Sequence, residues 1–165
     1  MKNLFLALAI CFSSVQVFGG NDGPSAAPRE MPRQTVLARV ASYDGMAQNG
    51  QLVIEILNNG QVKLVRGQLG GEVRISLLAT LSQSVLRSLK DSLKNVSDVT
   101  LVDNNPNGPM CEDAPVTSYQ ALKNGKLVKL KILEGCHTLS ILDPSYADHK
   151  VIQTLEALEL LARYN

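Results

Sequence analysis

Residues 51–65 read QLVIEILNNGQVKLV, and this stretch says most about the fold. Residues 51–57 are mainly β-branched and aliphatic, a composition that favours a strand. Residues 62–65 alternate around Lys63, which is the pattern of a second strand. Between them, Asn59-Gly60 tolerates the positive φ angles that a tight type I′ turn requires. The stretch therefore predicts a β-hairpin.

A second hairpin is predicted further along the chain. Residues 116–123 and 127–133 read as strands, and Asn124-Gly125 supplies the tight turn between them. The second of these strands alternates apolar residues with lysines, so one of its faces is buried and the other is solvated. The alternating residues are Val128, Leu130 and Ile132 with Lys129 and Lys131.

Shorter β-rich segments and two periodic segments complete the pattern. Further strands are predicted at residues 35–43, 73–77, 99–102 and 137–142. Apolar residues at three- and four-residue spacing predict a helix, with a capping box at Thr80 and Gln83; they are Leu81, Val85, Leu86, Leu89, Leu93 and Val96. A last helix is predicted over residues 147–163, with Val151, Ile152, Leu155, Leu158 and Leu161 on its apolar face.

These elements predict an α+β fold with one disulfide. An antiparallel sheet is built from two hairpins, and two amphipathic helices pack on one of its faces. The order is ββα-ββα-like, and the two Asn-Gly turns resemble each other. This order fits either a distant duplication or independent use of Asn-Gly because hairpins need it.

Residues 1–20, MKNLFLALAICFSSVQVFGG, have the features of a signal peptide. Lys2 precedes an apolar run, and Gly19 offers a small residue for cleavage. Lipidation at Cys11 is an alternative, but Ile10 stands where a lipobox has a small residue. Residues 21–34 are rich in Gly, Pro, Ala and Ser and are expected to form a flexible arm. Residues 35–165 are predicted to form a single domain, with no transmembrane segment after the leader.

The composition of the mature chain argues against nucleic-acid binding. Without Lys2 in the leader, the basic residues fall from 16 to 15 and balance the 15 acidic ones. There is no Trp, and all three Phe residues lie in the leader. Because the chain lacks a basic stripe and an aromatic platform, it has no means of neutralising phosphates or stacking bases.

Two cysteines remain after the leader, Cys111 and Cys136. An even cysteine count in an exported protein predicts a disulfide between them. A catalytic thiol would need an activated thiolate, and Cys136-His137 places neighbouring side chains on opposite faces of a strand. Zinc binding with His137 and His149 lacks the usual paired spacings. No cofactor is predicted.

An irregular segment, residues 103–115 (DNNPNGPMCEDAP), is the predicted binding loop. It matches the first half of a calcium loop, but Ala114 stands where a bidentate Glu is required, so no metal is predicted. Asn, Pro and Gly favour such a loop without any ion. The candidate binding residues are Asp103, Asn104, Asn105, Asn107, Glu112 and Asp113.

No catalytic residues are predicted, and the favoured function is a non-enzymatic exported module that binds another exported protein through this loop. From Val53 onward, the layout of strands, helix, strands and C-terminal helix resembles small secreted bacterial metalloprotease inhibitors of the emfourin type. That resemblance implies an inhibitor of an exported hydrolase as one alternative. The others are a hydrolase using Asp113, His137 and a nearby hydroxyl, and a structural envelope protein. The oligomeric state stays open.

Overall fold

A computed structural model describes residues 34–43, 50–67, 71–97, 100–109, 111 and 115–164. The predicted signal peptide, and all of the predicted N-terminal arm except Gln34, lie outside the described residues. Eight strands and two helices are described. They are β1 (Val36–Tyr43), β2 (Gln51–Leu57), β3 (Gln61–Gly67), β4 (Val73–Thr80), α1 (Gln83–Lys94), β5 (Leu101–Asp103), β6 (Val116–Lys123), β7 (Lys126–Glu134), β8 (His137–Ile141) and α2 (Tyr146–Tyr164).

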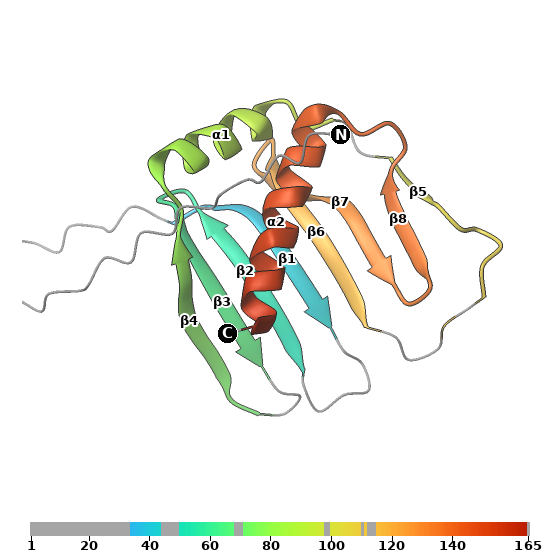
Figure 1. Ribbon diagram of the computed structural model, residues 1–165, viewed down its shortest axis with the longest axis horizontal. Helices are drawn as coiled ribbons and strands as arrows, with labels where there is room; N and C mark the ends of the chain where they lie inside the picture. The colour runs from blue at the N-terminus through green and yellow to red at the C-terminus, as the bar shows by residue number, and fades with distance from the viewer. Residues whose placement is uncertain are drawn as a thin grey trace, which may run out of the picture.

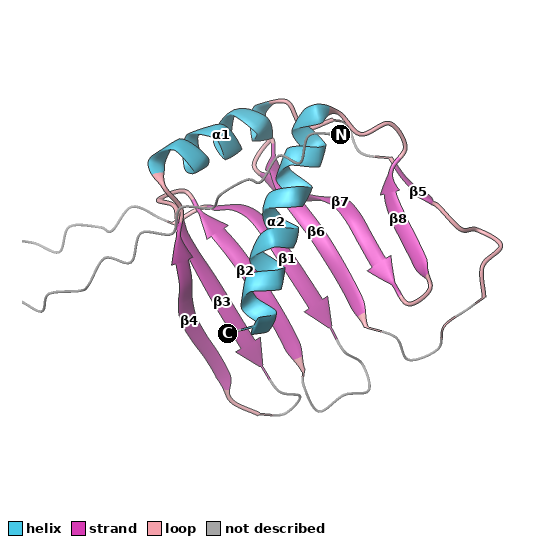
Figure 2. Cartoon of the chain, viewed as in Figure 1, coloured by secondary structure: helices cyan, strands magenta, loops and turns pink. Residues whose placement is uncertain are grey.

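All eight strands join one antiparallel sheet, in the order β4-β3-β2-β1-β6-β7-β8-β5. Both helices lie over the same face of this sheet, and α2 crosses it near β1 and β6 (Figures 1 and 2). The α+β class predicted from the sequence is therefore confirmed. The sheet is larger than two hairpins, because β1 pairs with both β2 and β6 and so joins the two predicted hairpins.

The two Asn-Gly turns differ in geometry. The β2–β3 connection has three residues, and Gly60 (φ 89°) is followed directly by β3. Its two Asn residues have no positive φ, so it is a three-residue loop and not the predicted type I′ turn. The β6–β7 turn has positive φ at Asn124 and Gly125, as type I′ requires. In chain order each turn joins the second and third strands of a ββββα segment. In the sheet, however, β1 lies beside β2 whereas β5 lies beside β8, so the two segments are arranged differently.

The start of α1 differs from the predicted capping box. Strand β4 continues to Thr80, which pairs with Gln61, so Thr80 cannot cap the helix. Ser82 is the N-cap instead, and its hydroxyl accepts a hydrogen bond from the Val85 N–H at 3.3 Å. Thr80, which the local pattern placed at the helix start, thus belongs to β4 because it pairs with β3.

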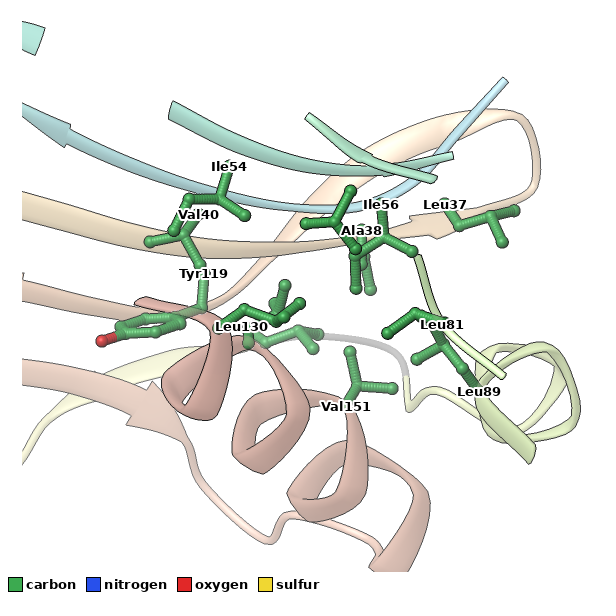
Figure 3. Packing of buried hydrophobic residues seen from close by; sticks show 14 of the residues in the cluster. Leu37, Ala38, Val40, Ile54, Ile56, Leu81, Leu89, Tyr119, Leu130 and Val151 are labelled. Carbon is green, nitrogen blue, oxygen red and sulfur yellow. The ribbon is translucent and has the colours of Figure 1, made fainter. Parts of the chain in front are cut away.

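The core lies between the sheet and the two helices (Figure 3). Val40 from β1 and Ile54 and Ile56 from β2 point toward the helices and are fully buried. Leu89 of α1 and Val151 of α2 close over them from the helix side. Burial of one such aliphatic side chain stabilises the fold by about 1.5–3 kcal/mol. An almost purely aliphatic core, with Tyr119 as its aromatic member, is therefore sufficient for this domain.

Candidate functional site

The loop that follows β5 is attached to the sheet at two points. At its start, the Asn104 N–H donates a hydrogen bond to the Thr138 carbonyl oxygen of β8 at 3.0 Å. Further on, Cys111 forms a disulfide with Cys136 in the β7–β8 turn, with their Cα atoms 5.5 Å apart. The disulfide predicted from the cysteine count is thus confirmed. These two contacts tie the loop to the β8–β5 edge of the sheet, which lies on the right of Figure 1, and between them the loop projects outward from this edge.

Asp103, the last residue of β5, organises the start of this loop. Its Oδ1 accepts a hydrogen bond from the Asn105 N–H at 2.9 Å, and its Oδ2 lies 2.8 Å from Nδ1 of His137. The hydrogen bond from Asn105 is the main cause that lowers the pKa of Asp103, and the contact with His137 adds to it against partial desolvation. Asp103 is therefore ionised at neutral pH and links the loop to β8.

Two further contacts fix the loop backbone. The side-chain amide of Asn104 and the hydroxyl of Ser140 exchange hydrogen bonds, at 3.0 Å and 3.2 Å. The Gly108 N–H donates to the Asn105 carbonyl oxygen at 2.9 Å and closes a turn. A Cβ at Gly108 would lie 2.1 Å from Nδ2 of Asn105, so a larger residue there would require the exposed Asn105 side chain to move. Residues 104–108 are consequently fixed by a backbone hydrogen bond within the loop and by side-chain hydrogen bonds to β8.

The structure divides the six predicted binding residues into three groups. Asn105 and Asn107 are exposed on the loop and belong to the part that faces solvent. Asp103 and Asn104 are committed to contacts with His137 and Ser140, so they shape the loop. The last two, Glu112 and Asp113, lie outside the described residues. Asn104 is also exposed, but among the described residues of the loop the side-chain amides of Asn105 and Asn107 are the ones not engaged in such contacts.

Among the described residues, the carboxylate that contacts His137 is that of Asp103, whereas Asp113, which the hydrolase alternative paired with His137, lies outside the described residues. An imidazole whose Nδ1 contacts a carboxylate has the orientation found in a catalytic triad. Within the described part of the chain, however, His137 has no hydrogen bond to a hydroxyl. Ser140 is three residues away on the same strand, which places it on the opposite face, and its hydroxyl is bonded to Asn104. The described residues thus supply two members of a triad and lack the nucleophile.

The pairing of Asp103 with His137 is the main feature of this site that the sequence did not reveal. The two residues are 34 positions apart and meet only because β5 pairs with β8. The available signal was that Asp103 directly follows one predicted strand, residues 99–102, and that His137 begins another, residues 137–142. That signal gives no information on which strands are neighbours.

The described residues contain no group of three or more His, Cys, Asp and Glu side chains that could hold a metal ion. In the same part of the chain, neither helix is sufficiently long and apolar to cross a membrane. No protein-family model matches the chain, and no curated protein is significantly similar to it. The function therefore has to be argued from the geometry of the chain itself.

Proposed function

We propose that this chain is an exported, non-enzymatic protein that binds another exported protein through the loop between β5 and β6. The observation that carries the proposal is the anchoring of the loop by the Cys111–Cys136 disulfide and by the Asp103–His137 contact. A stable disulfide is typical of proteins that leave the reducing cytoplasm, which supports export. Connections of this length in compact domains are commonly functional.

The anchoring supports binding for an energetic reason. A mobile loop loses about 0.5–1.5 kcal/mol of rotamer entropy for each long side chain that a partner immobilises, in addition to its backbone entropy. Here the turn from Asn105 to Gly108 and the reciprocal bonds between Asn104 and Ser140 have already fixed the backbone. A partner would therefore meet the Asn105 and Asn107 amides in a set position, and hydrogen bonds to them would contribute directly to affinity.

The same observation favours inhibition of an exported hydrolase as the narrower form of this function. A covalently anchored, exposed loop can occupy a cleft without first being ordered. The Asp103–His137 pair, in contrast, has no nucleophilic hydroxyl beside it among the described residues, so it does not support a hydrolase. Binding is therefore the function that the contacts of this loop support best.

The test is affinity capture with the protein produced from the full-length chain, oxidised and immobilised, against the exported protein fraction of its source. We expect one stoichiometric partner. The double variant Asn105→Ala/Asn107→Ala should lose at least about tenfold in affinity for that partner, which corresponds to about 1.4 kcal/mol. Its melting temperature should stay unchanged, because both side chains are exposed.

Gln153→Ala is the matched control, since it removes an exposed amide from α2, far along the chain from the loop. It should leave capture unchanged. Equal capture by the double variant and by the unmodified protein would exclude the loop as the binding surface. If the captured partner is a hydrolase, its residual activity in the complex decides whether the protein is an inhibitor.

A further inference from the structure

The two edges of the sheet are protected to very different degrees. β5 is three residues long and runs directly into the disulfide-anchored loop. β4 is eight residues long and, within the described part of the chain, its only strand neighbour is β3. It contains no proline and a single charged residue, Arg74. Because natural proteins shield sheet edges with short strands, charges, proline or covering segments, β4 stands out as an edge left open to another strand.

The open edge also carries a row of exposed apolar side chains. Val73, Ile75 and Leu77 are 60%, 67% and 59% exposed, and their alternation places them on one face of the strand. In the sheet register, Ile75 lies beside Val65 of β3, which in turn lies beside Val53 of β2. Val53 alternates with the core residues of β2, so this row lies on the sheet face opposite the helices.

We propose that β4 pairs with β4 of a second copy of this chain, forming a symmetric antiparallel dimer with one continuous sheet. With the two-fold axis at Ile75, each Ile75 faces the partner's Ile75, and each Val73 faces the partner's Leu77. Arg74 then lies opposite the partner's Ser76, so no like charges are directly opposed. This register aligns the apolar rows of both copies across the junction.

The charges and the apolar row of this edge are compatible with an identical strand. Arg74 is paired with Glu72 of its own chain at 3.7 Å, so two copies of the edge meet without net charge repulsion. The opposite edge cannot serve as the partner surface, because β5 offers only three residues. Contacts between β4 and β5 of successive copies are thereby disfavoured, and assembly closes at two subunits instead of growing into a filament.

The length of the edge sets the expected strength. With the axis at Ile75, residues 73–77 of each strand face the partner strand, and these five residues extend over about 17 Å. Backbone pairing over this length, together with the apolar row, gives an interface below about 1,200 Å², in the range of weak and transient contacts. We therefore expect a dissociation constant of order 10 μM, a weak dimer that mass action reveals only over a wide concentration range.

Sedimentation velocity and light scattering on the protein produced from the full-length chain test this directly, from about 1 to about 500 μM. The mass should rise from monomer to dimer over this range. Ile75→Lys should raise the dissociation constant at least about tenfold, because it opposes two ammonium groups at the axis. The Ile75 side chain is 67% exposed, so this substitution should leave the melting temperature unchanged. The control Leu160→Lys changes another exposed apolar residue, on α2, and should leave dimerisation unchanged.

A cysteine pair tests the register. Ile75→Cys should form an intermolecular disulfide, because directly opposed Cβ atoms are about 4.5–5.5 Å apart and need only a small shift to bridge. Val73→Cys should not, since the two equivalent residues would be about 14 Å apart. A monomer up to the highest concentration, a dimer insensitive to Ile75→Lys, or cross-linking at residue 73 instead of 75 would each overturn the proposal. None of these measurements depends on the loop that we propose for partner binding.

Discussion

Replacing Asp148 with alanine removes an acceptor that joins the start of α2 to the segment after α1. The Asp148 side chain is fully buried. Its Oδ1 accepts a hydrogen bond from the Ser97 N–H at 3.1 Å. Its Oδ2 accepts from the Ser97 hydroxyl at 2.7 Å, the Ser145 N–H at 2.8 Å and the Ser145 hydroxyl at 2.7 Å. In Asp148→Ala, two backbone N–H groups lose this partner where water has little access.

The size of the effect follows from these contacts. A buried donor left without an acceptor costs about 1–3 kcal/mol. The two serine hydroxyls can rotate toward other acceptors, so the two backbone donors dominate, and we expect a loss of about 3 kcal/mol in the free energy of unfolding. For an ordered domain of about 130 residues, an unfolding entropy near 2.1 cal/mol/K per residue converts this loss into a melting temperature about 10 °C lower.

Urea unfolding followed by far-UV circular dichroism measures this loss, because the chain has no Trp to report by fluorescence. Asp91→Ala is the matched control. Its carboxylate is exposed and pairs with Lys94 on the surface of α1, so its removal should change stability by less than about 0.5 kcal/mol. A loss below about 1 kcal/mol in Asp148→Ala, or one equal to that of the control, would refute the reasoning.

Asp148 also predicts how stability depends on pH. Burial alone would raise its pKa, but the hydrogen bonds from Ser97 and Ser145 outweigh burial, and the pKa lies below the usual range. The carboxylate therefore adds stability above its unfolded pKa of about 3.9, and this stability is lost as pH falls through the lower folded value. The urea midpoint of the unmodified protein should drop between about pH 5 and pH 2, and less steeply in Asp148→Asn, which cannot titrate.

Two other structural features give predictions of stability. Replacing both Cys111 and Cys136 with serine removes a cross-link across 25 residues. In the chain-entropy model this should lower the free energy of unfolding by about 3.5 kcal/mol, measured as a lower urea midpoint under oxidising conditions. Equal midpoints would show that the disulfide does not stabilise the fold. Gly60→Ala should lower the free energy of unfolding by about 1 kcal/mol more than Gly125→Ala does. Both glycines have positive φ, but only at Gly60 would the new Cβ lie close to another side chain, 3.3 Å from Leu86. Equal losses in thermal unfolding would show that backbone conformation alone sets the cost at Gly60.

Local patterns predicted most elements of this fold and its two hairpins, but not the order in which the remaining strands join the sheet. The bounds of β2 and β6 agree with the sequence, because alternation and Asn-Gly turns are encoded within a few residues. The central position of β1, between β2 and β6, depends on contacts across about half the chain, which no local pattern carries. The extension of β4 to Thr80 was missed for the same reason, since it depends on pairing with β3.

The candidate site shows the same division. Counting cysteines identified the Cys111–Cys136 disulfide, because two cysteines leave a single intramolecular pairing. The hydrolase alternative paired His137 with Asp113, which lies outside the described residues. The carboxylate that the structure brings to His137 is that of Asp103, through the pairing of β5 with β8. The disulfide was predictable because it follows from the number of cysteines. The Asp103–His137 contact required the structure, because it depends on which strands are neighbours in the sheet.

The two proposed surfaces lie at opposite edges of one sheet, and this arrangement makes them compatible. In an eight-stranded sheet, neighbouring strands are about 4.8 Å apart, so the β5 edge is about 34 Å from the β4 edge. Pairing through β4 would place the two anchored loops at the far ends of a sixteen-stranded sheet, about 70 Å apart. The dimer would then bind partners at both ends, and two weak loop contacts on a clustered partner would reinforce each other through effective concentration. Loss of dimerisation in Ile75→Lys should therefore weaken capture on a densely coated surface while leaving the affinity of a single loop unchanged.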